Sequence, residues 1–240
     1  MENKITLVIM NWLRVEVLKD DILPIMVEYD LIDEIIISHG REDTYFEFDN
    51  SKIVNRKDWG DINEYYGLSR RFLASSEANN DVILMIDDDE YPTEDAVNKL
   101  YRIHMENPKR LIGPFGHNLR NGNYNLHSRY GEVCVLITKC IMFNKELCWQ
   151  FFKHSPIMRD ILNEGKPYWN GEDIFMSAVA CHYYGVNNCG IQGCGNVNPI
   201  EGRENKRSRA VSSWRGFRKY RSDVVHYCAK YFGIWSKWVN

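Results

Sequence analysis

Two kinds of apolar pattern alternate along the chain. Short β-branched and aliphatic runs are typical of strands buried on both faces, and segments with helical spacing lie between them. The short runs predict strands at residues 5–10, 34–38, 52–54, 82–86 and 111–113, and a long one at 132–143. The other segments predict helices at residues 15–29, 63–78, 93–106, 147–152, 158–162, 174–184 and 222–232. Strand, helix and strand at this spacing form parallel crossover units, so we expect an α/β fold.

The predicted strand at residues 82–86 ends directly in four carboxylates, which are Asp87, Asp88, Asp89 and Glu90. The carboxyl ends of parallel strands border the crevice in which open α/β sheets bind ligands. Adjacent negative charges repel each other, and a divalent cation with hard oxygen ligands, Mg²⁺ or Mn²⁺, would offset them. Alternatively, the acids form a solvated turn before a helix that Glu94 and Asp95 cap. This stretch alone leaves both interpretations open.

Composition narrows the class of protein. A chain of 240 residues with 44% hydrophobic content is an ordinary size for one α/β domain, so we expect a single domain spanning residues 1–240. The net charge of −3 does not indicate nucleic acid as a partner. The first apolar run is too short for a signal peptide, and no run reaches the length of a transmembrane segment. Seven scattered cysteines predict free thiols in a reducing compartment, so we expect a soluble cytoplasmic protein.

A second carboxylate pair, Glu172 and Asp173, opens the predicted helix at residues 174–184. Acids at a helix N-terminus are stabilised by the helix dipole, so capping alone would explain them. Tyr168 and Trp169 precede the pair, however, and aromatic rings beside carboxylates commonly hold the faces of sugars.

Residues 199–221 are rich in arginine, lysine and aromatic residues. Such a segment suits RNA contacts, a solvated surface, or a mobile loop that closes over a diphosphate. The acidic cluster at residues 87–90 favours the third interpretation, because metal-binding carboxylates and a cationic loop together match a diphosphate leaving group.

Several separate motifs, in the same order, resemble the exostosin-like glycosyltransferases of the GT-A fold. The resemblance spans most of the chain and includes Asp87-Asp88-Asp89 as an Asp-x-Asp motif, residues 110–113, 132–138, 159–161 and 170–174, and the terminal stretch 221–233. It implies a mixed sheet flanked by helices, with a nucleotide-binding half to about residue 115 and an acceptor-binding half after it. It also implies a UDP-sugar donor, a glycan or oligosaccharide acceptor and Mn²⁺ (or Mg²⁺).

The resemblance assigns roles on the nucleotide side. Asp89 matches the direct metal ligand, with Asp87 beside it; Asp87 and Asp88 match positions near the ribose and the metal's waters. Arg71 matches a nucleotide-contacting arginine, and Asn11 and Arg14 lie where this fold holds uracil.

On the acceptor side, Asn170 and Asp173 match residues near the reacting anomeric carbon, with Glu172 and Trp169 beside them. Arg221 matches an arginine that faces the diphosphate. Gly171 and Val224 stand where the family has disulfide-forming cysteines, and Phe217 and Lys219 replace family histidines. The missing disulfide fits a reducing compartment.

The resemblance favours retention of anomeric configuration, but an inverting transferase with Asp173 as general base stays open. A sugar nucleotidyltransferase would normally carry a Gly-rich basic loop after the first strand, and Asn11 to Arg14 has none. A glycan-binding module without activity is a further alternative. Trp235 and Trp238 would suit either a homodimer interface or the end of the core.

Overall fold

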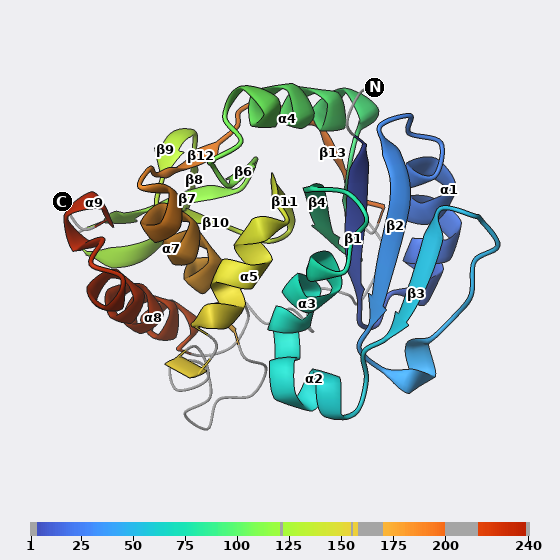
Figure 1. Ribbon diagram of the computed structural model, residues 1–240, viewed down its shortest axis with the longest axis horizontal. Helices are drawn as coiled ribbons and strands as arrows, with labels where there is room; N and C mark the ends of the chain where they lie inside the picture. The colour runs from blue at the N-terminus through green and yellow to red at the C-terminus, as the bar shows by residue number, and fades with distance from the viewer. Residues whose placement is uncertain (1–3, 121, 155, 158–169, 200–215, 239–240) are drawn as a thin grey trace.

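The computed structural model describes residues 4–120, 122–154, 156–157, 170–199 and 216–238 (Figure 1). Its centre is an eight-stranded sheet with the strand order β3-β2-β1-β4-β11-β6-β12-β9. These strands are β1 (Ile5–Asn11), β2 (Ile32–His39), β3 (Ile53–Lys57), β4 (Val82–Asp87), β6 (Ile112–Gly113), β9 (Gly131–Val133), β11 (Cys140–Asn144) and β12 (Asn188–Gly190). β3, β2, β1 and β4 run parallel, and β11 is antiparallel to β4 and to β6. The expected α/β fold with a mixed sheet is therefore confirmed.

The central strands are apolar throughout because both faces of the sheet are covered. Val8 of β1 and Met85 of β4 pack into one hydrophobic cluster, and Leu7 and Leu84 pack into a second cluster on the opposite face. Such double burial explains why these strands show continuous apolar runs and no alternation of polar and apolar residues.

Helices cover both faces (Figure 1). The cluster that contains Val8 also contains residues of α3, α5, α7 and α8, and the cluster that contains Leu7 also contains residues of η1, α1 and α4. The helical segments are η1 (Val17–Ile22), α1 (Leu23–Met26), η2 (Glu42–Thr44), α2 (Asp61–Tyr66), η3 (Gly67–Ser69), α3 (Arg70–Ser76), α4 (Glu94–Glu106), α5 (Glu146–Lys153), α7 (Glu172–Tyr184), α8 (Phe217–Tyr231) and α9 (Trp235–Trp238).

Several predicted helices differ from the observed ones. The helix expected at residues 15–29 is a π-helical turn followed by one α-helical turn that contains Pro24, which has no backbone N–H to donate. The helix expected at residues 63–78 is interrupted at Gly67, whose φ of 51° is accessible to glycine without strain. The last long helix begins at Phe217 and not at residue 222, so it contains Arg221.

The cap of α4 is also different from the expected one. Thr93 is the N-cap residue, and its hydroxyl oxygen accepts a hydrogen bond from the backbone N–H of Ala96. Glu94 and Asp95 lie in the first helical turn, where their charges interact favourably with the helix dipole.

No strand was predicted in the polar region at residues 116–131, but the structure has two there. It forms the hairpin of β7 (Gly116–Arg120) and β8 (Asn123–Arg129), and β10 (Val135–Leu136) pairs with β7. The apolar stretch 132–143 is consequently not one strand beside β4. It divides into β9, β10 and β11, and only β11 pairs with β4. A uniformly apolar run carries no alternation that would indicate which sheet each part joins.

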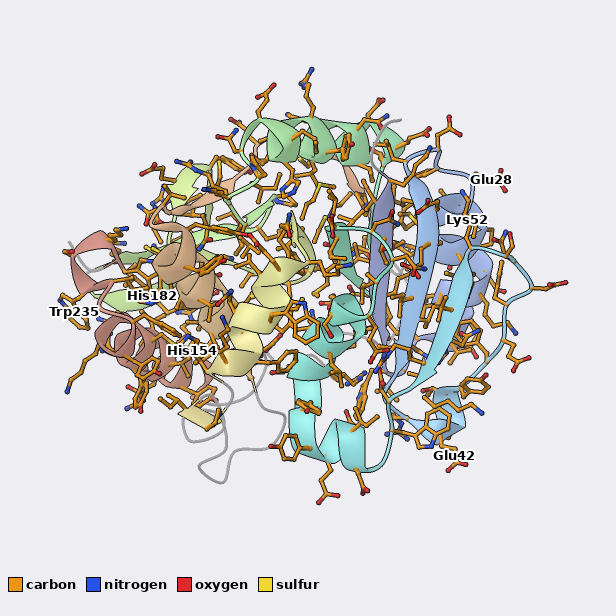
Figure 2. All side chains as sticks on the ribbon, in the orientation of Figure 1. Glu28, Glu42, Lys52, His154, His182 and Trp235 are labelled. Carbon is orange, nitrogen blue, oxygen red and sulfur yellow. The ribbon has the colours of Figure 1, made fainter. Side chains whose placement is uncertain are left out.

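A further two-stranded ladder joins β5 (Tyr91–Pro92) to β13 (Asn196–Val197). All seven cysteines lie in the described part of the chain and are unpaired, as predicted. Trp238 is buried and completes the core, whereas Trp235 projects from α9 and is 44% exposed (Figure 2). Among the described residues, no helix has the length and apolar character that a membrane span requires.

Candidate active site

The four consecutive carboxylates lie at the carboxyl end of β4, and basic side chains surround them. Arg71 is 3.0 Å from Asp87, and Lys139 is 2.7 Å from Glu90. Arg14 is 2.5 Å from Asp88 and 3.4 Å from Asp89. Three cations of the chain therefore offset much of the mutual repulsion. From the sequence, only a divalent metal ion was considered for this role.

Asp88 connects the carboxylate cluster to the segment that follows β1. Its side chain is buried, and one carboxylate oxygen accepts hydrogen bonds from the backbone N–H groups of Trp12 (3.0 Å) and Leu13 (3.3 Å). The other oxygen accepts a hydrogen bond from Arg14. Both oxygens thus fix the loop at the end of β1, a role that sequence analysis did not anticipate. A ribose contact for Asp88 and a uracil contact for Arg14 stay predictions.

Asp87 and Asp89 have spare ligand capacity. Oδ1 of each is buried and forms no hydrogen bond with a described residue, although Oδ1 of Asp87 lies in the 3.0 Å ion pair with Arg71. Burial, followed by the charge of Asp87, raises the pKa of Asp89 to about 6, although Arg14 and Lys139 oppose the shift. Buried carboxylate oxygens without donors fit a hard divalent cation, which takes one or two protein carboxylates and completes its shell with water and substrate phosphates. No cluster of three or more candidate ligand side chains occurs within the described ranges.

Asn11 lies at the end of β1, next to the carboxylates. Its side-chain amide donates hydrogen bonds to the carbonyl of Thr44 and to Nδ1 of His39, both at 2.9 Å. Nε2 of His39 in turn donates to Asn55, and burial lowers the pKa of His39. The imidazole is therefore neutral, and Oδ1 of Asn11, buried and without a described donor, is an acceptor available to a ligand.

Arg71 of α3 lies between the two groups of carboxylates. Besides its contact with Asp87, it donates hydrogen bonds to the backbone carbonyls of Leu68 and Thr138. Burial and the adjacent charge of Asp173 raise the pKa of Glu172, and the charge of Arg71 opposes that shift. Arg71 thus acts electrostatically on both Asp87 and Glu172.

The second group of carboxylates is built around Asp173 and Arg221. Nη2 of Arg221 donates a 2.6 Å hydrogen bond to Oδ2 of Asp173, and Nη1 donates a 3.0 Å bond to Oδ1 of Asn170. Oδ1 of Asp173 accepts a hydrogen bond from the backbone N–H of Ile174. Gly171, with φ of 106°, forms the bend before α7 that brings Asn170 back toward Arg221. In the structure Arg221 is buried and positions Asp173; a contact with a diphosphate stays a prediction.

A model of the glycosyl transferase family 64 domain matches residues 5–236. The chain belongs to this family. It is therefore a glycosyltransferase with a nucleotide-sugar donor, and its resemblance to the exostosin-like enzymes is confirmed.

The site of this family 64 glycosyltransferase includes residues that sequence analysis missed. Tyr124 of β8 accepts a 3.1 Å hydrogen bond from Arg221, and its ring centroid is 4.4 Å from the guanidinium carbon. Burial raises the pKa of Tyr124 to about 12, so its hydroxyl stays protonated. Tyr220 donates a hydrogen bond to the backbone carbonyl of Asn170. Tyr124 was missed because the hairpin that carries it was not predicted. Lys139 could have been identified from the sequence, because it is the only basic residue in the apolar stretch 132–143.

Trp169 and most of the basic segment 199–221 lie outside the described residues, so their predicted roles have no structural counterpart here. At the end of that segment, Lys219 is exposed and pairs with Asp223 on α8. Phe217 packs 5.3 Å from the guanidinium of Arg221.

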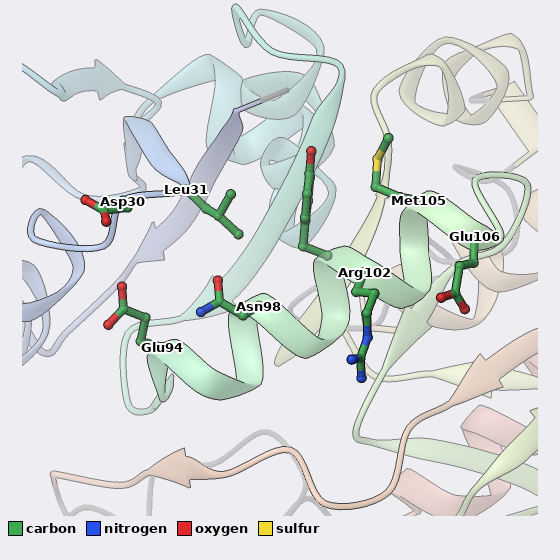
Figure 3. Close-up of a pocket in the computed structure, with 8 residues that line it drawn as sticks. Asp30, Leu31, Glu94, Asn98, Arg102, Met105 and Glu106 are labelled. Atoms are coloured by element: carbon green, nitrogen blue, oxygen red, sulfur yellow. The ribbon is translucent and has the colours of Figure 1, made fainter. Parts of the chain in front are cut away.

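One surface pocket of the transferase lies away from this site. It is formed by α4 together with Asp30 and Leu31, the residues that precede β2 (Figure 3). α4 lies at the opposite end of the sheet from α2 (Figure 1). None of the carboxylates or arginines of the candidate active site lines this pocket.

Proposed function

We propose that the protein transfers a sugar from a UDP-sugar to a hydroxyl group of a glycan or oligosaccharide, with retention of anomeric configuration and with Mn²⁺ (or Mg²⁺). Membership of family 64 supports the reaction class and the nucleotide-sugar donor. The resemblance to the exostosin-like enzymes favours retention. Each carboxylate oxygen of Asp173 accepts one hydrogen bond, from Arg221 or from Ile174, and keeps a second lone pair, so the stereochemistry of the product decides between retention and a general-base role.

On the nucleotide side, Asp89 would hold the metal through its unpartnered Oδ1, and Asp87 through a carboxylate that also pairs with Arg71. When bound, the metal supplies positive charge against the diphosphate. Asn11 offers a hydrogen-bond acceptor to the base, and Arg14 and Asp88 fix the loop beside it. Arg71 places a positive charge next to Asp87, on the side of the leaving group.

On the acceptor side, Asp173 holds a negative charge that steadies the positive anomeric centre as the glycosidic bond breaks. Arg221 orients Asp173 through their ion pair, and Asn170 is held by the same guanidinium. In retention, an oxygen of the departing diphosphate takes the proton of the acceptor hydroxyl. Glu172 lies beside these groups and is buried, and Trp169 would contact the sugar face.

The organisation of the chain follows from these roles. We propose one domain over residues 1–240, whose nucleotide-binding half ends near residue 115 and whose acceptor-binding half follows it. The antiparallel pairing of β11 with β4 supports one domain, because it joins both halves in a single sheet. Seven unpaired cysteines support a reducing compartment such as the cytoplasm. A homodimer and the absence of a nucleic-acid partner stay predictions.

The first experiment is calorimetric titration of the purified protein with UDP, with Mn²⁺ and then with excess chelator. We expect binding that the chelator reverses. Hydrolysis of a panel of UDP-sugars then nominates the donor, and NMR of the anomeric proton in the transfer product distinguishes retention from inversion. Absence of UDP binding under both conditions would contradict the proposal and favour a glycan-binding module; an inverted product would make Asp173 a general base.

A further inference from the structure

Arg70 is a buried cation that has no carboxylate partner in the part of the chain that the structure describes. Its side chain is 1% exposed, and its guanidinium donates hydrogen bonds to the carbonyls of Asn11 (3.1 Å) and Gly67 (3.4 Å) and to Oδ1 of Asn63 (3.0 Å). All three acceptors are neutral, and within the described ranges no carboxylate forms an ion pair with it. A buried charge is normally paired, because the loss of hydration is costly.

Arg70 lies at the carboxyl ends of β1 and β2, the edge of the sheet where open α/β proteins have their ligand-binding crevice. Its guanidinium carbon is 5.4 Å from the ring centroid of Trp12, in the loop that Asp88 fixes. It also fills the space beside Gly40, where an added Cβ atom would lie 2.3 Å from Nη2. Arg70 therefore contacts the end of β1, the residue after β2 and the loop between β1 and η1.

The charge of Arg70 is only partly compensated there. Nε of Arg70 is buried and has no described hydrogen-bond partner. Burial and the neighbouring Arg71 lower the pKa of Arg70 to about 10, which still leaves the guanidinium charged at neutral pH. Asp58, Asp88 and Asp87 act on it only from a distance. An anion in the crevice would complete this compensation.

We propose that Arg70 is a positioning residue of the nucleotide site whose uncompensated charge makes the crevice favour a nucleoside diphosphate over the neutral nucleoside. This inference rests on the proposed function, because it takes UDP as the ligand. Arg70 acts through the Asn11 backbone and through its field on the diphosphate. Hydrogen bonds and charge interactions of this kind change affinity by roughly tenfold.

The decisive quantity is the ratio of the dissociation constants of uridine and UDP, measured by calorimetry with Mn²⁺. Arg70→Gln should weaken UDP binding roughly tenfold and change uridine binding less than about twofold. Arg70→Lys, which keeps the charge, should preserve the ratio. Arg41→Gln is the matched control: Arg41 also lies near Trp12, at 5.5 Å, but it is half exposed and paired with Asp43, so the ratio should not change.

A second variant tests the charge without removing Arg70. Asn63→Asp places a carboxylate at an atom that Arg70 already contacts, so it should form an ion pair that compensates the charge of the guanidinium. The fold should stay at least as stable, and the affinity for UDP should fall more than the affinity for uridine. In the Arg70→Gln background the same change should add less than about twofold, because its partner is absent. Asn63→Ala removes the contact without adding charge and should leave the ratio unchanged.

Equal losses of UDP and uridine affinity in Arg70→Gln, or unchanged UDP affinity in Asn63→Asp, would overturn the inference. Failure of the wild-type protein to bind UDP at all would instead overturn the proposed function, so the two failures are distinguishable.

Discussion

Two buried aspartates of the site are each held by one arginine, Asp88 by Arg14 and Asp173 by Arg221. The pairs differ in what surrounds them. Arg14 is also shared with Asp89, whereas Arg221 is held by Asn170 and Tyr124 as well. Removal of one partner from a buried pair leaves an uncompensated charge, so substitutions at these residues need a stability measurement beside the activity measurement.

Replacing Asp173 with Asn removes the charge near the reacting carbon but keeps the shape of the side chain. We expect UDP affinity near the wild-type value and a loss of transfer of roughly 10²-fold or more, measured with the donor that the panel identifies. Asp223→Asn, an exposed carboxylate on α8, is the control. Retained turnover in Asp173→Asn, with thermal stability unchanged, would show that the catalytic carboxylate lies elsewhere.

Asp89→Ala removes the carboxylate whose buried Oδ1 has no described partner. We expect metal-dependent UDP binding to be lost in calorimetry, because a single remaining carboxylate holds the ion weakly. Asp95→Ala, an exposed acid in the first turn of α4, should bind UDP as the wild type does. Unchanged UDP affinity in Asp89→Ala would exclude it as a metal ligand.

The helices on the two faces of the sheet owe their stability to different side chains. On one face, aromatic rings connect three helices: Phe151 of α5 is 4.5 Å from Phe72 of α3 and 5.3 Å from Phe175 of α7, measured between centroids. On the other face, α4 buries His104, and Nδ1 of this histidine has no described partner. The first arrangement is insensitive to pH, and the second is not.

His104 should make unfolding depend on pH. Burial lowers the pKa of His104 from 6.5 to about 4. Between these values the unfolded chain binds a proton that the native protein does not, so the stabilisation is complete above pH 6.5 and is lost as the pH falls toward 4. We expect the free energy of unfolding to fall by about 2 kcal/mol more between pH 7 and pH 5 in the wild type than in His104→Leu. Equal losses in urea titrations would contradict this assignment.

Phe151→Ala should lower the free energy of unfolding by about 3–5 kcal/mol, because it opens a cavity between three helices. Trp149 lies on the same helix but is 59% exposed, so Trp149→Ala is the control and should change stability by about 0.5 kcal/mol at most. Chemical denaturation of both variants measures the difference. A small effect in Phe151→Ala would mean that α5 contributes little to the core.

At the scale of the whole molecule, the fold is held together without covalent cross-links, since all seven cysteines are free. Five of them are buried, and only Cys189 and Cys194 are partly exposed. Gly171 and Val224 occupy the positions where the family resemblance would have a disulfide, and Val224 instead packs in the core. The junction of α7 and α8 therefore depends on apolar packing and on the contacts of Arg221.

Thermal unfolding should consequently be the same with and without a reducing agent. A thiol reagent should modify at most two cysteines in the native protein and seven in denaturant, because burial blocks access and raises the pKa of the remaining thiols, such as Cys148. Fewer than seven reactive thiols in non-reduced, denatured protein would reveal a disulfide.

Local sequence patterns were sufficient to predict the parallel strands and the carboxylates at their ends. β1 and β4 are buried on both faces, so their apolar runs end where the chain leaves the sheet, and Asn11 and Asp87 follow directly. The hairpin at residues 116–129 could not be found in this way. Its strands are largely polar, and the backbone N–H of Tyr124 donates a hydrogen bond to the hydroxyl of Ser222, which is 98 residues away.

The sequence by itself thus determined the parallel strands β1, β2, β3 and β4, the place of the two carboxylate groups and the family of the protein. Only the tertiary structure decided which cation pairs with which carboxylate. Arg14 pairs with Asp88, 74 residues away in the chain, and Arg221 pairs with Asp173, 48 residues away. Among the described residues the tertiary structure also left Arg70 without an ion-pair partner, although Arg71, its neighbour in the chain, contacts Asp87. The physical reason is that adjacent residues of a helix face different directions, so their partners are set by the packing of α3 against the sheet and not by local sequence.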